Sequence, residues 1–209
     1  MDTSELADEA VTNAKLAHVA TDRIKGRTTA GTGDVEDLTA AQTKAILLPE
    51  GGILGEGELL DTSSGTSFNT TNLGGITTPK KVTIVFESVS LGGTDDILVQ
   101  LGDSGGIETS SYNSVTTAAG LGTGGVVTST SGFVVKAGNA GRSIHATMTI
   151  HNVTGNVWVA SHCGGLTDAT AGALVGGGTK TLSATLSQIT VTRTGTGNFD
   201  GGQIRLFFE

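Results

Sequence analysis

The sequence predicts a mainly β protein, in which a short N-terminal helical segment precedes an antiparallel β-sandwich of a jelly-roll-like type. Apolar and polar residues alternate along residues 82–87, 97–101 and 144–151, as they do in half-buried strands. Turn-forming residues separate such segments about every 8–12 residues, which is typical of sandwiches and barrels. The chain holds 33 Gly, 2 Pro and 4% aromatic residues, so we expect a core of small aliphatic side chains.

Residues 1–49 are predicted to form a helix, a loop and a second, short helix, and to act as an anchor and oligomerisation segment. Ser4 fits the N-cap of the first helix, and Gly26 fits the position directly after its end. Six residues spaced four and three apart form a heptad-type seam on one face of this helix, which is typical of helices that associate. They are Leu6, Ala10, Asn13, Ala17, Ala20 and Ile24. The same pattern is compatible with a single amphipathic helix that lies on a sheet.

The second helix is predicted from its two ends. Thr39 and Gln42 form a capping box at its start, and Pro49 stops it. A segment as small and as poor in large apolar residues as residues 1–49 does not bury enough surface to fold alone. It therefore needs a neighbour, either the β domain or further copies of itself.

Residues 50–75 are expected to form a connector with a first irregular strand, and residues 76–209 the distal β-sandwich domain. Segments 80–89 and 97–101 predict a hairpin at the centre of a sheet, because the residues between them are rich in turn formers. Residues 143–151 predict a strand with Ile144, Ala146, Met148 and Ile150 on its inner face. Gly155-Asn156 predicts the turn into the next strand, where Trp158 is expected in the core.

Charge and cysteine content narrow the class of protein. The net charge of -8 argues against binding to the backbone of nucleic acids and to anionic membrane surfaces. No apolar run approaches the ~18 residues of a membrane span, and the acidic N-terminus lacks the apolar core of a signal peptide. Cys163 is the only cysteine, so it forms no intrachain disulfide, and we expect it to be a small buried or half-buried side chain. Assembly in a reducing cytoplasm is therefore expected.

The sequence contains no pattern that predicts catalysis, a cofactor or a metal site. It has no P-loop, no zinc-finger spacing and no ordered Ser-His-Asp set. Asp95, Asp96, Asp103 and Glu108 would supply ligands for Ca²⁺ only if they gathered at one end of the domain. We expect them to be solvated loop carboxylates instead, in a protein that is not an enzyme and carries no cofactor.

Two parts of the chain resemble tail fibre proteins of tailed bacteriophages. Residues 13–17 and 24–42, the latter reading IKGRTTAGTGDVEDLTAAQ, are similar to a cassette that precedes the distal domain of such fibres. Val35 departs from it, because the family commonly has proline there. Residues 81–86, 99–109, 157–161, 181–186 and 199–204 are similar to segments of one distal fibre domain. Thr78-Pro79 stands where that domain often carries a tryptophan.

The resemblance implies a structural virion protein that is assembled in the cytoplasm of the host bacterium. It implies a homotrimeric tail fibre, held to other virion proteins by residues 1–49, whose distal β domain binds a bacterial surface receptor, either a glycan or a surface protein. The loops at 90–96 and 102–125 would carry the receptor-contact candidates, which are Asp95, Asp96, Tyr112 and Asn113. Tyr112 is the ring best placed for stacking on a sugar. Two alternatives remain: a head fibre or capsid decoration protein anchored by residues 1–49, and a depolymerase that cleaves surface glycans.

Overall fold

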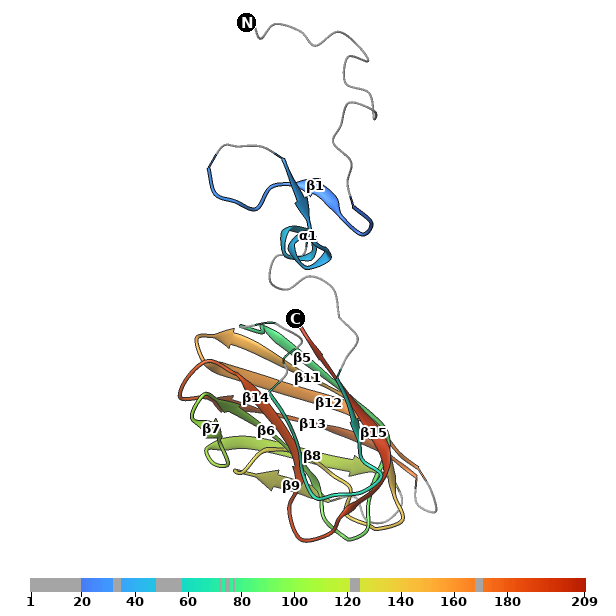
Figure 1. The fold of residues 1–209 in the computed structure, drawn as a ribbon. Helices are drawn as coiled ribbons and strands as arrows, with labels where there is room; N and C mark the ends of the chain where they lie inside the picture. The colour runs from blue at the N-terminus through green and yellow to red at the C-terminus, as the bar shows by residue number, and fades with distance from the viewer. Residues whose placement is uncertain are drawn as a thin grey trace, which may run out of the picture. The chain divides into compact units, whose positions relative to one another are not determined.

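The computed structural model describes residues 20–31, 35–47, 58–71, 73, 76, 78–120, 125–167 and 171–209. The chain divides into two compact units, Met1–Pro49 and Glu50–Glu209. In Figure 1 the described part of the first unit is blue, and the second unit runs from cyan to red.

The first unit contains a two-stranded ribbon followed by a short helix. Strand β1 (Ile24–Gly26) pairs antiparallel with β2 (Glu36–Leu38), and helix α1 (Ala40–Leu47) follows. The predicted capping box is confirmed. Thr39 Oγ1 accepts the Gln42 N–H at 3.1 Å, and Gln42 Oε1 accepts the Thr39 N–H at 2.9 Å. These reciprocal hydrogen bonds fix the residue at which the helix begins.

The predicted first helix is wrong at its C-terminal end. Ala20 lies outside any helix, and Ile24 lies in strand β1 with 53% of its side chain exposed. Asp22 has a φ of 60°, a left-handed conformation that a residue inside an α-helix does not adopt. The remaining seam candidates, Leu6, Ala10, Asn13 and Ala17, lie outside the described residues. The two described seam positions therefore do not form a helical seam.

Contacts across the ribbon explain why this segment is extended. Lys25 Nζ lies 2.5 Å from Asp37 Oδ1 on the paired strand. Gly26 was predicted to follow the end of a helix, but it is a strand residue beside Leu38. A Cβ at Gly26 would lie 2.4 Å from Leu38 Cδ1, so the absence of a side chain allows Leu38 to be buried there. Both contacts join residues about a dozen positions apart, which a local helix pattern does not reveal.

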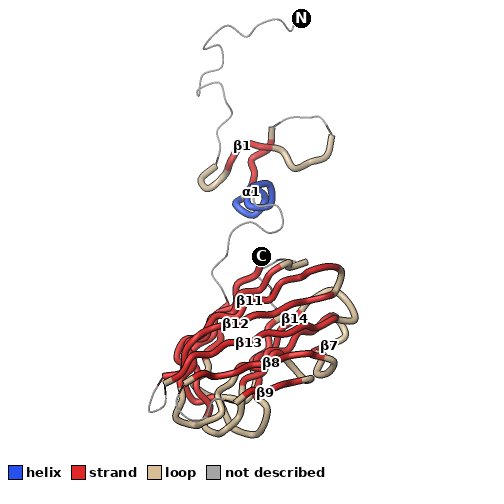
Figure 2. The backbone as a smooth tube through the Cα atoms, turned by 180° about the vertical axis from the view of Figure 1, so that it is seen from behind, coloured by secondary structure: helices blue, strands red, loops and turns tan. Residues whose placement is uncertain are grey.

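The second unit is a sandwich of two antiparallel sheets, which confirms the predicted mainly β class. Its strands are β3 (Glu58–Asp61), β4 (Phe68–Thr70), β5 (Lys81–Leu91), β6 (Ile97–Asp103), β7 (Gly106–Ile107), β8 (Tyr112–Ala119), β9 (Val126–Ser129), β10 (Phe133–Val135), β11 (Ser143–Thr154), β12 (Val157–Thr167), β13 (Gly172–Thr181), β14 (Gln188–Arg193) and β15 (Phe199–Phe208). Eight strands form one sheet in the order β3-β15-β5-β11-β12-β13-β8-β9. The other sheet has the order β10-β6-β14-β4, with β7 paired to β6. Figures 1 and 2 show these sheets as two stacked layers.

Strands β11 and β12 form the hairpin that the sequence predicted. Residues 144, 146, 148 and 150 are buried, whereas His145, Thr147 and His151 are exposed. Thr154 pairs with Val157, so Gly155 and Asn156 form the turn between the strands. Gly155 has a φ of 50°, a left-handed conformation that glycine adopts without a steric penalty.

The predicted hairpin of residues 80–89 and 97–101 is wrong. Strand β5 pairs with β11 and β15 in the eight-stranded sheet, whereas β6 pairs with β14, β10 and β7 in the other. Residues 92–96 therefore cross from one layer to the other. The inner side chains of both strands, such as Ile84 and Val99, belong to the same core between the sheets. Alternation identifies two half-buried strands, but it does not distinguish strands that pair edge to edge from strands that face each other.

The core lies between the two sheets and combines small aliphatic side chains with a few large ones. Phe86, Phe133, Phe199 and Met148 are among its largest fully buried side chains. Trp158 is 3% exposed, which confirms its predicted place in the core.

The sandwich has two different ends. Glu58, at the start of β3, pairs with Leu206 near the end of β15, and the Glu209 N–H donates to the Lys81 carbonyl at 2.9 Å. We call this the proximal end, because the described chain enters the sandwich there. The opposite, distal end carries the loops at 62–67, 92–96, 136–142 and 194–198, which backbone hydrogen bonds connect to one another.

Candidate functional site

Two aspartates brace the loops of the distal end. Asp95 Oδ2 accepts the Gly197 N–H at 2.6 Å, and Asp96 Oδ1 accepts the Ala137 N–H at 2.8 Å. The Asp96 N–H donates to Thr194 Oγ1 at 3.0 Å. Burial raises the pKa of the Asp96 carboxyl above its usual value. Both predicted contact residues are half-buried and use carboxylate oxygens to hold neighbouring loops, so they position the loops.

The exposed side chains of these loops are mainly neutral and polar. They include Thr94, Asn139, Thr194, Thr196 and Asn198. Hydroxyl and amide groups both donate and accept hydrogen bonds. The distal end therefore presents uncharged hydrogen-bonding groups on a braced frame. Sequence reasoning missed Asn139 and residues 194–198, because these residues come beside residues 92–96 only through the folding of strands far apart in the chain.

Tyr112 does not lie on the surface, and its prediction as a contact residue is wrong. Its side chain is 3% exposed, and its hydroxyl accepts the Leu101 N–H at 2.7 Å. Its ring packs edge-on against Phe133, with 5.1 Å between the ring centroids. Burial raises the pKa of the Tyr112 hydroxyl. The inward position on β8 places this ring in the core, although its sequence neighbours are polar.

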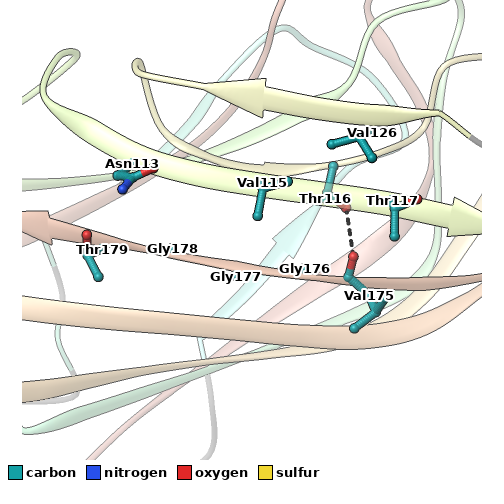
Figure 3. Close-up of a pocket in the computed structure, with 10 residues that line it drawn as sticks. All are labelled: Asn113, Val115, Thr116, Thr117, Val126, Val175, Gly176, Gly177, Gly178 and Thr179. Carbon is teal, nitrogen blue, oxygen red and sulfur yellow. Dashed lines mark hydrogen bonds between the residues drawn. The ribbon is translucent and has the colours of Figure 1, made fainter.

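Asn113 is exposed, but it lies on strand β8 and not on a loop. Tyr112 pairs with Lys180 near the proximal end, so this part of β8 is far from residues 92–96. The structure therefore does not bring the four predicted contact residues together. Asn113 instead lines a shallow depression of about 460 Å³ on the outer face of the eight-stranded sheet, shown in Figure 3.

Cys163 lies on the same outer face and is exposed. The prediction that it is buried or half-buried is therefore wrong. Adjacent residues of a strand point to opposite faces, and on β12 the inward position goes to the neighbouring His162, which is 4% exposed.

Polar groups at the proximal end form a structural network. The buried Lys180 donates to the Ser110 carbonyl at 2.8 Å and lies 2.5 Å from Glu108 Oε2. Asp103 Oδ2 accepts the Ser183 hydroxyl at 2.6 Å, a hydrogen bond that lowers the pKa of the Asp103 carboxyl. Glu108 accepts the Ser183 N–H at 2.7 Å. These groups tie the loop after β6 to the segment between β13 and β14.

The acids considered as ligands for Ca²⁺ do not gather at one site. Asp95 and Asp96 precede strand β6 at the distal end, whereas Asp103 ends that strand at the proximal end. Seven residues of strand separate the two groups by roughly 20 Å. Among the described residues, no group of three or more His, Cys, Asp or Glu side chains is placed to hold a metal ion.

His162 is a buried polar side chain that belongs to the core and not to a surface site. Its Nε2 lies 3.0 Å from Thr116 Oγ1, and its Nδ1 has no hydrogen-bond partner among the described residues. A Cβ at Gly176 on the adjacent strand would lie 2.4 Å from its ring, so this glycine makes room for the imidazole. Burial lowers the pKa of His162 to about 4, which keeps the ring neutral at pH 7.

Comparisons with known proteins identify no relative of this chain. No protein-family model, no curated protein and no solved structure matches the chain. Within the part of the chain that the structure describes, no helix is long and apolar enough to cross a membrane.

Proposed function

We propose that this chain is a subunit of a bacteriophage fibre and that its β-sandwich binds the surface of the host bacterium. The distal loops carry this proposal. They lie at the end opposite to the one at which the described chain enters the sandwich, and they expose neutral hydroxyl and amide groups on a braced frame. A rigid β scaffold with polar loops at its free end suits recognition, because loops vary in chemistry without loss of the fold.

The receptor that fits these loops best is a surface glycan. Its many hydroxyl groups require partners that both donate and accept hydrogen bonds, as Thr94, Thr196 and Asn198 do. Such contacts are individually weak. Three copies in one homotrimeric fibre would raise the overall affinity by binding several sugar units of the same surface at once.

The remainder of the proposal follows the resemblance of residues 24–42 to the fibre cassette. In this proposal residues 1–49 attach the fibre to other virion proteins, and the β-sandwich points away from the particle. The contact with the host is non-covalent, and the protein cleaves nothing.

The first test compares two threonines that are exposed in loops at opposite ends of the sandwich. Thr94→Arg places a bulky charged side chain among the distal loops, and Thr109→Arg does so at the proximal end. When the protein carries a fluorescent label, its binding to a panel of bacterial cells should fall at least tenfold for Thr94→Arg, because the arginine blocks close approach of the glycan. Thr109→Arg should bind like the wild type, and both variants should keep the wild-type melting temperature.

Two further measurements identify the class of the receptor and test for cleavage of glycans. Periodate treatment of the cells should abolish wild-type binding if the receptor is a glycan, whereas protease treatment should abolish it if the receptor is a surface protein. New reducing ends in purified polysaccharide after incubation would show a depolymerase. Equal binding by the two arginine variants would contradict the placement of the site at the distal end.

A further inference from the structure

The outer face of strands β12, β13, β8 and β9, which we call the uncharged face, exposes no charged side chain. The four strands lie side by side at one edge of the eight-stranded sheet, as Figure 2 shows. Their sequences contain one residue of the types Asp, Glu, Lys and Arg, namely Lys180, and it points into the core with 3% of its surface exposed, as does the neutral His162 with 4%. The whole chain is 15% charged and carries a net charge of -8. This face is therefore unlike the average surface of the protein.

Exposed valines and a glycine floor shape the uncharged face. Val115, Val126, Val159 and Val175 are exposed by 44, 70, 39 and 54%. Gly177 takes an outward position on β13 beside its cross-strand partner Val115, and its missing side chain opens the depression seen in Figure 3. The face thus combines protruding valines with a shallow hollow.

The chemistry of this face fits a protein partner better than a sugar. The exposed valines offer no hydrogen bond to the hydroxyl groups of a sugar, whereas the threonine and asparagine side chains of the distal loops do. A phosphorylated or acidic ligand would need a basic group, which the face does not expose. Valine, threonine and glycine on a flat sheet instead suit another flat surface that packs at the spacing of ~10 Å between stacked sheets.

We propose that the uncharged face is the contact between copies of this chain, which rests on the homo-oligomeric fibre of the proposed function. Every copy carries a net charge of -8, so copies repel one another, and a contact face without charged side chains adds no local repulsion to this. In a closed ring of three copies each subunit meets its two neighbours through different parts of its surface, so the protruding valines of one copy pack against the glycine hollow of the next.

The size of the face approaches that of such a contact. Strands β12, β13, β8 and β9 have 11, 10, 8 and 4 residues, and at a strand spacing of ~4.8 Å and ~3.3 Å per residue they cover roughly 500 Å². Specific interfaces bury about 600–1,000 Å² on each partner. Thr147 and Thr149 of the neighbouring strand β11 extend the uncharged area further. With these residues the face comes close to the lower end of that range.

The native Cys163 reports on this contact, because it is exposed on the same face and is the only thiol in the chain. In the full-length protein, light scattering should give a trimer mass, and Cys163 should react with a thiol reagent at least tenfold more slowly than in a monomer. Val175→Asp should convert the trimer to monomers and release the thiol, because it buries an unpaired charge in the contact. Val153→Asp is the matched control, since Val153 is 62% exposed near the tip of the β11–β12 hairpin and should leave the mass and thiol reactivity unchanged.

Circular dichroism and thermal melting must show that Val175→Asp remains folded, and Val115→Asp replaces it if it does not. A wild-type monomer would overturn the inference, as would a Val175→Asp trimer with a freely reactive thiol. A Val175→Asp monomer in which Cys163 stays protected would also overturn it, because another part of the same chain would then cover the face. Loss of cell binding by Thr94→Arg with an unchanged trimer mass separates this inference from the proposed receptor site.

Discussion

Tyr112→Ala is expected to lower the free energy of unfolding by about 3–5 kcal/mol. The change removes a ring that is 3% exposed and packs edge-on against Phe133 at 5.1 Å. It also leaves the Leu101 N–H, which donates to the Tyr112 hydroxyl at 2.7 Å, without this partner in the core. The cavity and the unpaired amide both destabilise the folded state. Equilibrium unfolding in urea, followed by tryptophan fluorescence, measures the change.

Tyr112→Phe separates the two contributions. It keeps the ring and removes only the hydroxyl, so the loss should be smaller, about 1–3 kcal/mol for a buried amide left without its acceptor. Neither variant should alter cell binding under conditions in which it remains folded. A Tyr112→Ala protein with wild-type stability and no cell binding would contradict the core position of this ring and return it to the receptor site.

Acidification from pH 7 to pH 4 should lower the free energy of unfolding by about 3 kcal/mol through His162 alone. Burial lowers the pKa of His162 to about 4 in the folded protein, whereas the unfolded chain titrates near the ordinary histidine value of ~6.5. Between these two values the unfolded state binds the proton and the folded state does not. The stability is therefore complete above about pH 6.5, falls as the pH drops towards 4, and loses nothing more from this group below that.

Denaturation in urea at a series of pH values tests this prediction. His162→Gln keeps a side chain that can bond to Thr116 and removes the titration, so its stability should fall less steeply between pH 6.5 and pH 4. His145→Gln is the matched control, because His145 is exposed on β11 and the same substitution there leaves the core unchanged. Identical profiles for the wild type and His162→Gln would show that the burial of this imidazole does not govern the acid sensitivity.

The sequence was sufficient where a local pattern determines the structure. The alternation of residues 144–151 identified β11 and its inner face, because one face of this strand is buried and the other is exposed. The capping box at Thr39 and Gln42 identified the start of α1, because both partners of the hydrogen bonds lie within one helical turn. Trp158 was placed correctly because it lies between two valines on a regular strand.

The sequence was insufficient where contacts between distant segments determine the structure. Whether β5 and β6 share a sheet depends on β11, β14 and β15, which follow them by 40 or more residues. Ile24 has a helix-compatible spacing, but its cross-strand partner Leu38 fixes it in a ribbon. For the same reason, the candidate site in the structure differs from the one that the sequence predicted. Asp95 and Asp96 do lie at the distal end, but their role as braces follows from contacts with residues 137 and 194–197, which no local pattern indicates.

The location of the protein on intact phage particles tests the central claim most directly. An antibody raised against residues 50–209, coupled to gold particles and applied to purified virions, would mark the position of the β-sandwich in electron micrographs. The proposed function predicts label at the far ends of the tail fibres and blocking of adsorption by the antibody. Label on the head would instead identify a head fibre or capsid decoration protein, and virions without label would contradict a structural role in the particle.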